Sequence, residues 1–182
     1  MTIQIPDMLQ YDGMKDFHIV GLDKVWPFRP EAYGLQPHDR FTACYRGYFC
    51  QYEVRNQQLW LKELCIWLED TLVPVEWSGT WTKPDMLGCS KCRGVELSVP
   101  YTGKMLICRE FVHKNHYYAG WERPIDYRQT FELELHEGRV IEVTDYSHMM
   151  EEVRGLTELG EREQELFADD LFTAYHKKWV YY

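Results

Sequence analysis

The stretch FELELHEGRVIEV, residues 131–143, decides the fold class of this chain. Apolar and polar side chains alternate from Phe131 to His136, and apolar residues return at Ile141 and Val143 after a Glu-Gly pair. Alternation with a period of two is typical of a β-strand that buries one face. The stretch therefore predicts a β-hairpin.

The loop of this hairpin sets its register. A two-residue loop would place Leu133 opposite a glutamate and mix the two faces of the hairpin. A three-residue loop that ends at Gly138 keeps the apolar residues together, and this loop type favours glycine at its last position. We expect the three-residue loop, which pairs Phe131 with Val143 and Leu133 with Ile141.

Residues 41–54 and 59–68 form a second predicted hairpin. Both segments are rich in aromatic and β-branched residues, and a polar turn at residues 55–58 separates them. If Val54 opposes Leu59, then Tyr48 opposes Cys65, and one continuous apolar face results.

Residues 95–99 and 104–112 form a third predicted hairpin around the turn PYTG. A further short strand is expected within residues 75–81. The turn pairs Val99 with Lys104. Continuing this register sets Cys92 beside Phe111 and Ser90 beside His113.

The C-terminal segment predicts helix. Ser147 is a candidate N-cap, Gly155 and Gly160 interrupt the pattern, and the main helix should span residues 157–178. An apolar stripe at i, i+4, i+7 and i+8 should face the core. It consists of Phe167, Leu171, Ala174 and Tyr175.

The chain of 182 residues is long enough for one domain with one core. Residues 1–40 are dense in proline and glycine, which predicts an irregular N-terminal arm packed on the body. Residues 41–145 should form the β body and residues 147–180 the helical C-terminal segment. The expected fold class is α+β, mainly antiparallel β, with a curled sheet or a sandwich of hairpins and a C-terminal amphipathic helix.

Charge and hydropathy exclude two classes of partner. The formal net charge is -9 and no run of Lys or Arg could follow a phosphate backbone, so we expect no nucleic acid. No stretch of about 18 apolar residues could span a bilayer, and residues 1–9 lack a basic, apolar leader, so we expect no membrane partner. In a soluble cytoplasmic protein the six cysteines stay thiols or bind metal.

Two pairs of metal-ligand residues share one spacing. Cys89 and Cys92 lie in the stretch GCSKCRG, and His113 and His116 have the same gap. Structural zinc sites take four Cys and His ligands in a tetrahedron. Because the register of the third hairpin brings both pairs to its open end, the sequence suggests a zinc site there. The favoured interpretation is a surface loop with two thiols and two exposed histidines, and no cofactor, with zinc as the alternative.

Six aromatic residues gather in segments expected to be loop or tail. Aromatic side chains on loops are enriched at protein interfaces and in ligand pockets. The alternative is that they close the open ends of the sheet. These candidate binding residues are Tyr117, Tyr118, Trp121, Trp179, Tyr181 and Tyr182.

The stretch Tyr45-Arg46-Gly47-Tyr48, with Tyr52-Glu53-Val54 and Leu59-Trp60-Leu61 after it, resembles a strand pair of a family of small uncharacterised bacterial β-rich proteins. Later strands of that family follow in the same order, so the resemblance covers about residues 41–145. It implies a bacterial, β-rich domain. Since no activity is established for the family, the resemblance carries over no catalytic residue.

The chain contains no nucleophile elbow, no H-E-x-x-H pair and no phosphate-binding glycine loop. We therefore expect a non-catalytic bacterial cytoplasmic protein that binds another protein, such as a toxin-immunity or defence accessory factor. One alternative is a zinc-binding domain or metalloenzyme that uses the Cys and His cluster. A further alternative is a small-molecule pocket inside the curled sheet.

Overall fold

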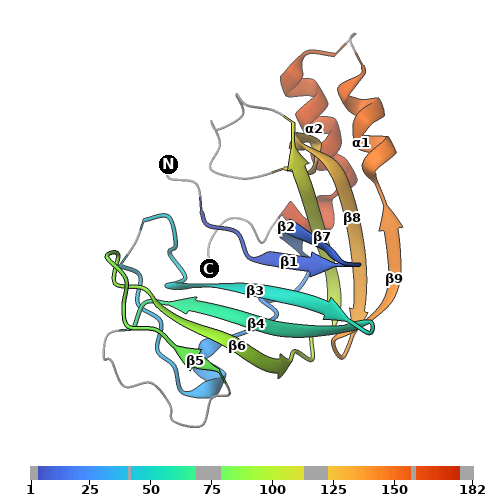
Figure 1. The fold of residues 1–182 in the computed structure, drawn as a ribbon. Coiled ribbons are helices and arrows are strands. Elements are labelled where there is room, and N and C mark those ends of the chain that lie inside the picture. The colour runs from blue at the N-terminus through green and yellow to red at the C-terminus, as the bar shows by residue number, and fades with distance from the viewer. Residues whose placement is uncertain (1–3, 41, 69–78, 113–122, 157–158, 177–182) are drawn as a thin grey trace.

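The structure is a computed structural model that describes residues 4–40, 42–68, 79–112, 123–156 and 159–176 (Figure 1). Nine β-strands dominate these residues, and helices follow them. The α+β, mainly antiparallel fold class expected from the sequence is confirmed. The strands are β1 (Met8–Tyr11), β2 (Met14–Leu22), β3 (Tyr48–Arg55), β4 (Gln58–Ile66), β5 (Thr80–Trp81), β6 (Ser90–Ser98), β7 (Gly103–Phe111), β8 (Tyr127–His136) and β9 (Arg139–Asp145). The helices are α1 (Ser147–Arg154), α2 (Glu161–Leu171) and the single turn α3 (Thr173–His176), with short 3-10 turns η1 (Pro30–Tyr33) and η2 (Pro124–Asp126).

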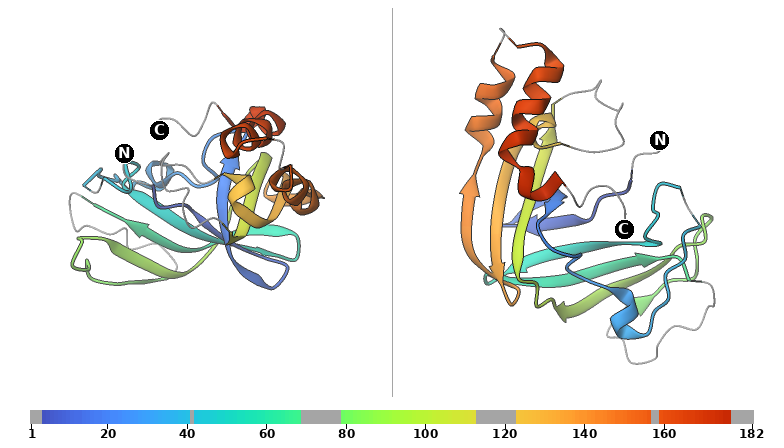
Figure 2. Two further views of the ribbon diagram at one scale, coloured as in Figure 1. Left: turned by 90° about the horizontal axis from the view of Figure 1, so that it is seen from above. Right: turned by 180° about the vertical axis from the view of Figure 1, so that it is seen from behind.

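The nine strands belong to one strongly curled sheet. Their order is β3-β1-β2-β7-β8-β9-β4-β6-β5, and β3 also pairs with β4. The sheet therefore closes on itself, although β9 and β4 share only the pair Gln58↔Arg139. Figures 1 and 2 show two arms set at a wide angle, one made of β2, β7, β8 and β9 and the other of β3, β4, β5 and β6.

Each arm buries the face that looks toward the other arm. Leu61 of β4, Met105 of β7 and Leu133 of β8 are fully buried in this main core. A second cluster lies on the opposite face of β7 and β8, where α1 and α2 cover the sheet (Figure 2). The arm made of β2, β7, β8 and β9 thus lies as a layer between the main core and the helices.

The corner where the arms meet is tightly packed around Gly138. Its N–H donates to the carbonyl oxygen of Tyr101 at 2.7 Å, and its own carbonyl accepts from the N–H of Leu59 at 2.8 Å. A Cβ at this position would lie 2.1 Å from the carbonyl oxygen of Val99. Only glycine fits, because the position also has a φ of 80°.

The expectation of an irregular arm over residues 1–40 is wrong for its first half. β1 and β2 form a hairpin whose turn residues Asp12 and Gly13 have φ values of 49° and 73°. These left-handed values define the two-residue turn that Asp-Gly favours. β1 also pairs in parallel with β3, so this segment is an integral part of the sheet.

The β3–β4 hairpin is present, with part of its register corrected. Val54 opposes Leu59 as expected, but Tyr48 opposes Ile66 rather than Cys65. A register irregularity beside Gln51 shifts the pairing by one residue. Lys62 of β4 has no counterpart in β3, and the buried positions of β4 therefore change from Leu59 and Leu61 to Leu64 and Ile66.

The β8–β9 hairpin is also present, but the expected three-residue loop is wrong. His136 pairs with Arg139, so the loop has two residues, with φ values of 49° at Glu137 and 80° at Gly138. A bulge beyond Val140 then restores apolar pairing, since Leu133 opposes Val143. The bulge achieves what the longer loop was expected to achieve.

The third predicted hairpin does not form. β6 pairs with β4 and β5, whereas β7 pairs with β2 and β8. The chain crosses from one arm to the other at residues 99–102. The pairing of Val99 with Lys104 and that of Cys92 with Phe111 are therefore wrong, and His113, the expected neighbour of Ser90, lies outside the described residues.

The C-terminal helix is divided and rotated relative to the expectation. α1 begins at Ser147 with Tyr146 as its N-cap, and separate helices α2 and α3 replace one helix over residues 157–178. The buried stripe of the second helical segment is Ala168, Phe172 and Tyr175. The expected stripe shares only Tyr175 with it.

Candidate functional site

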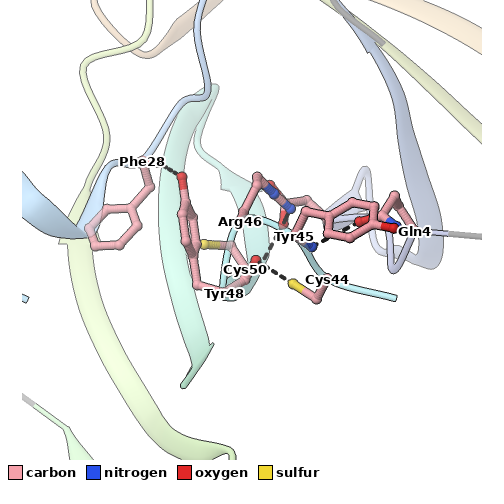
Figure 3. Close-up of polar contacts among 8 residues, drawn as sticks. Gln4, Phe28, Cys44, Tyr45, Arg46, Tyr48 and Cys50 are labelled. Atoms are coloured by element: carbon pink, nitrogen blue, oxygen red, sulfur yellow. Dashed lines mark hydrogen bonds and ion pairs between the residues drawn. The ribbon is translucent and has the colours of Figure 1, made fainter. Parts of the chain in front are cut away.

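A dense group of polar and ionisable side chains lies where the N-terminal segment meets the loop before β3 (Figure 3). Asp7 is fully buried just before β1, and both of its oxygens accept hydrogen bonds from Arg46, at 2.9 and 3.2 Å. Asp7 Oδ1 also accepts from the N–H of Cys50 at 2.8 Å. One carboxylate thus joins β3 to the loop before it.

Arg46 is enclosed by aromatic rings. Its guanidinium carbon lies 3.5 Å from the ring centroid of Trp26 and 4.8 Å from that of Tyr48. Burial lowers the pKa of Arg46, but the charge of Asp7 and its hydrogen bonds outweigh burial, so the net pKa is raised. Arg46 is therefore a permanent cation that is already fully paired.

The thiols and phenol of this cluster are held in their neutral forms. Burial raises the pKa of Cys50 well above its usual value, and burial also raises the pKa of Cys44 against the opposing charge of Arg46. The Cys44 thiol donates to the backbone carbonyl oxygen of Tyr48. The hydroxyl of Tyr48 donates to the backbone carbonyl oxygen of Phe28 at 3.0 Å. Because the thiolate is the nucleophilic form, these thiols are poor nucleophiles.

The same region is tied together through the backbone. The N–H of Ile5 donates to the carbonyl of Ala43 at 2.7 Å, and Gln4 exchanges bonds with Thr42 and Tyr45 at 2.9 and 3.0 Å. The cluster therefore fixes the N-terminal segment beside β3, and we call Asp7, Arg46 and Cys50 the clasp. It gives a physical role to the Arg46-Gly47-Tyr48 stretch on which the sequence resemblance depends.

The cysteines predicted to hold zinc have other surroundings. Cys89 is joined to Cys65 in a disulfide whose Cα atoms are 6.2 Å apart, so the expectation that all cysteines are thiols or metal ligands is wrong for this pair. Cys92 is buried in β6 opposite Leu64 and Trp81. Burial and the charge of Glu63 raise the pKa of Cys92 to about 11.

The geometric reason for a zinc site was the pairing of β6 with β7, and that pairing does not form. His113 and His116 lie outside the described residues, so the four-ligand set stays a prediction. Within the part of the chain that the structure describes, no group of three or more His, Cys, Asp and Glu side chains could hold a metal ion.

The aromatic candidates also lie outside the described residues, and their binding role stays a prediction. These are Tyr117, Tyr118, Trp121, Trp179, Tyr181 and Tyr182.

A groove of about 610 Å³ lies between the start of β8, the end of β9 and α1. Its lining mixes Arg128, His148 and Arg154 with Asp145 and Glu151. The Nη1 group of Arg154 donates to the carbonyls of Ile125 and Tyr127, both at 2.8 Å. The groove therefore favours no class of ligand, because it carries charges of both signs and because Arg154 already donates to backbone carbonyls of the protein.

The outward face of α2 carries large apolar side chains. Leu166, Phe167 and Leu171 are 55%, 48% and 41% exposed, and we call these three residues the α2 strip. The exposed residues Glu163 and Asp170 lie on the same face at helical spacing. Phe167 and Leu171 belong to the stripe that the sequence assigns to the core, so the expectation of burial is wrong for these two residues.

Comparisons of the chain with protein-family models, with curated proteins and with solved structures find no match. Among the described residues, no helix has the length and apolar character needed to cross a membrane.

Proposed function

We propose that this chain is a non-catalytic protein-binding domain that docks a partner on the α2 strip. The observation that carries the proposal is the exposure of Leu166, Phe167 and Leu171, each above 40%, on one helix of 11 residues. A helix on the surface of a protein normally turns polar residues outward. Grouped apolar side chains rimmed by polar ones are typical of interaction sites.

The surroundings of the strip specify the chemistry of the partner. Glu163 and Asp170 are exposed beside the apolar side chains, and the whole chain has a net charge of -9. A complementary segment carries apolar side chains flanked by Lys or Arg. An amphipathic helix with a basic rim has this pattern and fits an apolar helical face.

The buried cluster supports a binding role over a catalytic one. The Asp7–Arg46 pair is used to join the N-terminal segment to β3, and burial raises the pKa of the adjacent thiols. The interior of the curled sheet is filled by side chains such as Leu61, Met105 and Leu133. That packing gives no support to a small-molecule pocket inside the sheet.

The proposal includes the narrower expectation of a bacterial protein that neutralises or assists another protein, as toxin-immunity and defence accessory factors do. Its cytoplasmic location stays an expectation, and the Cys65–Cys89 disulfide does not favour it, because thiols in the cytoplasm normally stay reduced. An acidic surface favours this role because it attracts a basic target and speeds the encounter. Identification of a basic target protein would test this narrower part.

The α2 strip can be tested with a defined probe. A synthetic helical peptide of about 18 residues, with a Leu face bordered by Lys, should bind the wild-type chain, and fluorescence anisotropy measures the dissociation constant. The variant Phe167→Asp/Leu171→Ser should bind at least about tenfold more weakly. It should remain folded, because both side chains are largely exposed.

The matched control is Met86→Ser. Met86 is fully exposed on the connection between β5 and β6, far from α2 (Figure 1). The control variant should bind the peptide as the wild type does. Equal binding by the wild type and the α2 variant, with both folded by circular dichroism, would contradict the proposal.

A further inference from the structure

The outer edge of β9 is a second surface with a defined pattern. Among the described residues, β9 pairs along its length with β8, but on its other side it pairs with β4 only at Arg139. α1 packs over β8 and leaves this edge uncovered (Figure 1). An open strand edge presents backbone N–H and C=O groups that can pair with another strand.

Apolar and acidic side chains alternate along this edge. Ile141 and Val143 are 59% and 42% exposed, and Glu142 between them is also exposed. From Glu142 to Asp145 the pairing with β8 is regular, so side chains at successive positions point to opposite faces. This part of β9 can therefore continue the sheet.

In the described part of the chain, one row of charged side chains across the sheet ends in two neighbouring carboxylates with no cation beyond them in the row. In one row Lys104 of β7 opposes Glu134 of β8, and Glu134 opposes Glu142 of β9. Lys104 Nζ lies 3.7 Å from Glu134 Oε2, but the next step places two carboxylates directly opposite each other. Like charges directly opposite on neighbouring strands are unfavourable, and a cation beside Glu142 would offset this.

The neighbouring row has the opposite character. Met105 of β7 opposes Leu133 of β8, which opposes Val143 of β9. Met105 and Leu133 are fully buried, whereas Val143 at the end of the row is partly exposed. An apolar side chain in the next position would complete the burial of this row.

We propose that the β9 edge binds an extended segment of a partner protein by strand addition, with Lys or Arg opposite Glu142 and an apolar residue opposite Val143. This surface is separate from the α2 strip, and the inference does not require that the α2 strip binds anything. Backbone hydrogen bonds supply affinity, and alternate side chains supply specificity.

The same edge discriminates against a second copy of the chain. Antiparallel pairing of two β9 strands centred on Glu142 would place two Glu142 side chains side by side, next to the two Glu134 side chains. The bulge at Ile141 also bends the edge. A charged residue and a bulge are devices that oppose self-pairing while leaving a basic strand acceptable.

The test uses a cyclised β-hairpin peptide whose outer strand alternates Lys with Val, and a matched peptide with Glu in place of Lys. Amide hydrogen exchange measured by NMR reports on the β9 backbone. The Lys peptide should bind the full chain, slow the exchange of outward β9 amides and bind at least about tenfold more tightly than the Glu peptide. Double substitution of the α2 strip should leave this binding unchanged.

Charge exchange provides the decisive control. Glu142→Lys should weaken binding of the Lys peptide by about tenfold and restore binding of the Glu peptide. The variant should fold, because Glu142 is exposed and the change removes a like-charge pair. Equal binding of both peptides, unchanged exchange in β9, or a wild-type dimer that protects β9 would each overturn the inference.

Discussion

The hydroxyl of Tyr175 donates a 2.6 Å hydrogen bond to Oε2 of Glu132, and this bond fixes the helical turn α3 to the middle of the sheet. Glu132 is nearly buried on the helix side of β8, and its other oxygen accepts from Lys104 Nζ at 2.8 Å. Tyr175 is thus the partner of a carboxylate that water hardly reaches.

Tyr175→Phe should lower the free energy of unfolding by about 1.5–3 kcal/mol, because one oxygen of a nearly buried carboxylate loses its donor. Urea denaturation followed by tryptophan fluorescence measures the change. Tyr45→Phe is the control, since Tyr45 is 60% exposed and should change stability little. Equal stability of Tyr175→Phe and the wild type would contradict this role.

Stability should fall in alkaline solution. Burial raises the pKa of Tyr175, Tyr48 and Tyr101 above the ordinary value of 10.0. The folded chain therefore keeps phenol protons that the unfolded chain releases, so the stability present below pH 10.0 is lost as the pH rises above it. Urea denaturation at pH values from 8 to 11 measures the decline, which should be small below pH 10.0 and should approach about 1.4 kcal/mol per pH unit for each tyrosine above it. Tyr175→Phe should make the loss of stability with rising pH less steep, because one of the three tyrosines no longer contributes to it.

Gly21→Ala should destabilise the docking of the C-terminal helices. A Cβ on Gly21 of β2 would lie 2.9 Å from Cδ1 of Tyr175 and 3.3 Å from Cβ of Leu106. We expect a cost of about 1–3 kcal/mol, as in other overpacked cores. The cost should shrink in a Tyr175→Ala background, and a double-mutant cycle measures the difference. Additive costs would show that Tyr175 is not the obstacle.

Removal of either partner of the Asp7–Arg46 pair should destabilise the fold by about 3–5 kcal/mol, since the other charge is left buried and unpaired. The double variant Asp7→Ala/Arg46→Ala should cost less than the sum of the single variants. Arg55→Ala is the control, because Arg55 and its partner Glu96 are 42% and 45% exposed and such pairs contribute little to stability. Similar losses for Arg46→Ala and Arg55→Ala would refute the clasp.

The Cys65–Cys89 disulfide should contribute about 3 kcal/mol, given that it closes a loop of moderate length. Reductant should lower the stability of the wild type by this amount and leave Cys65→Ser/Cys89→Ser unaffected. Before reduction the unfolded chain should titrate four thiols and after reduction six, matching Cys44, Cys50, Cys92 and Cys108 plus the released pair. Six thiols without reductant would rule out the disulfide.

The sequence predicts the fold class because alternation within strands such as β8 depends on local pattern alone. It also contains the signal for the β1–β2 hairpin, since Asp12-Gly13 between apolar runs favours a two-residue turn. That signal was outweighed by the surrounding prolines and glycines. The irregularity beside Gln51 does alter the apolar pattern of β4, but the expected register assumes regular pairing throughout the hairpin. A bulge at Ile141 and a longer loop both keep apolar residues opposite one another, so the pattern does not distinguish them.

The candidate site was harder to predict than the fold. The zinc hypothesis required β6 to pair with β7, and only the tertiary fold decides that β6 pairs with β4 instead. The Cys65–Cys89 disulfide depends on that same pairing. For α2 the sequence shows apolar residues on two sides of one helix, and propensity does not decide whether Phe167 or Phe172 turns inward.

The packing around Gly138 has a practical consequence for protein engineering. The β8–β9 turn is used inside the molecule, so an epitope tag or a grafted loop placed at Glu137-Gly138 would separate the two arms of the sheet. The β1–β2 turn is different, because a Cβ on Gly13 would meet nothing within 4 Å. Asp12-Gly13 is therefore a better position than Glu137-Gly138 for inserting foreign sequence for labelling or immobilisation.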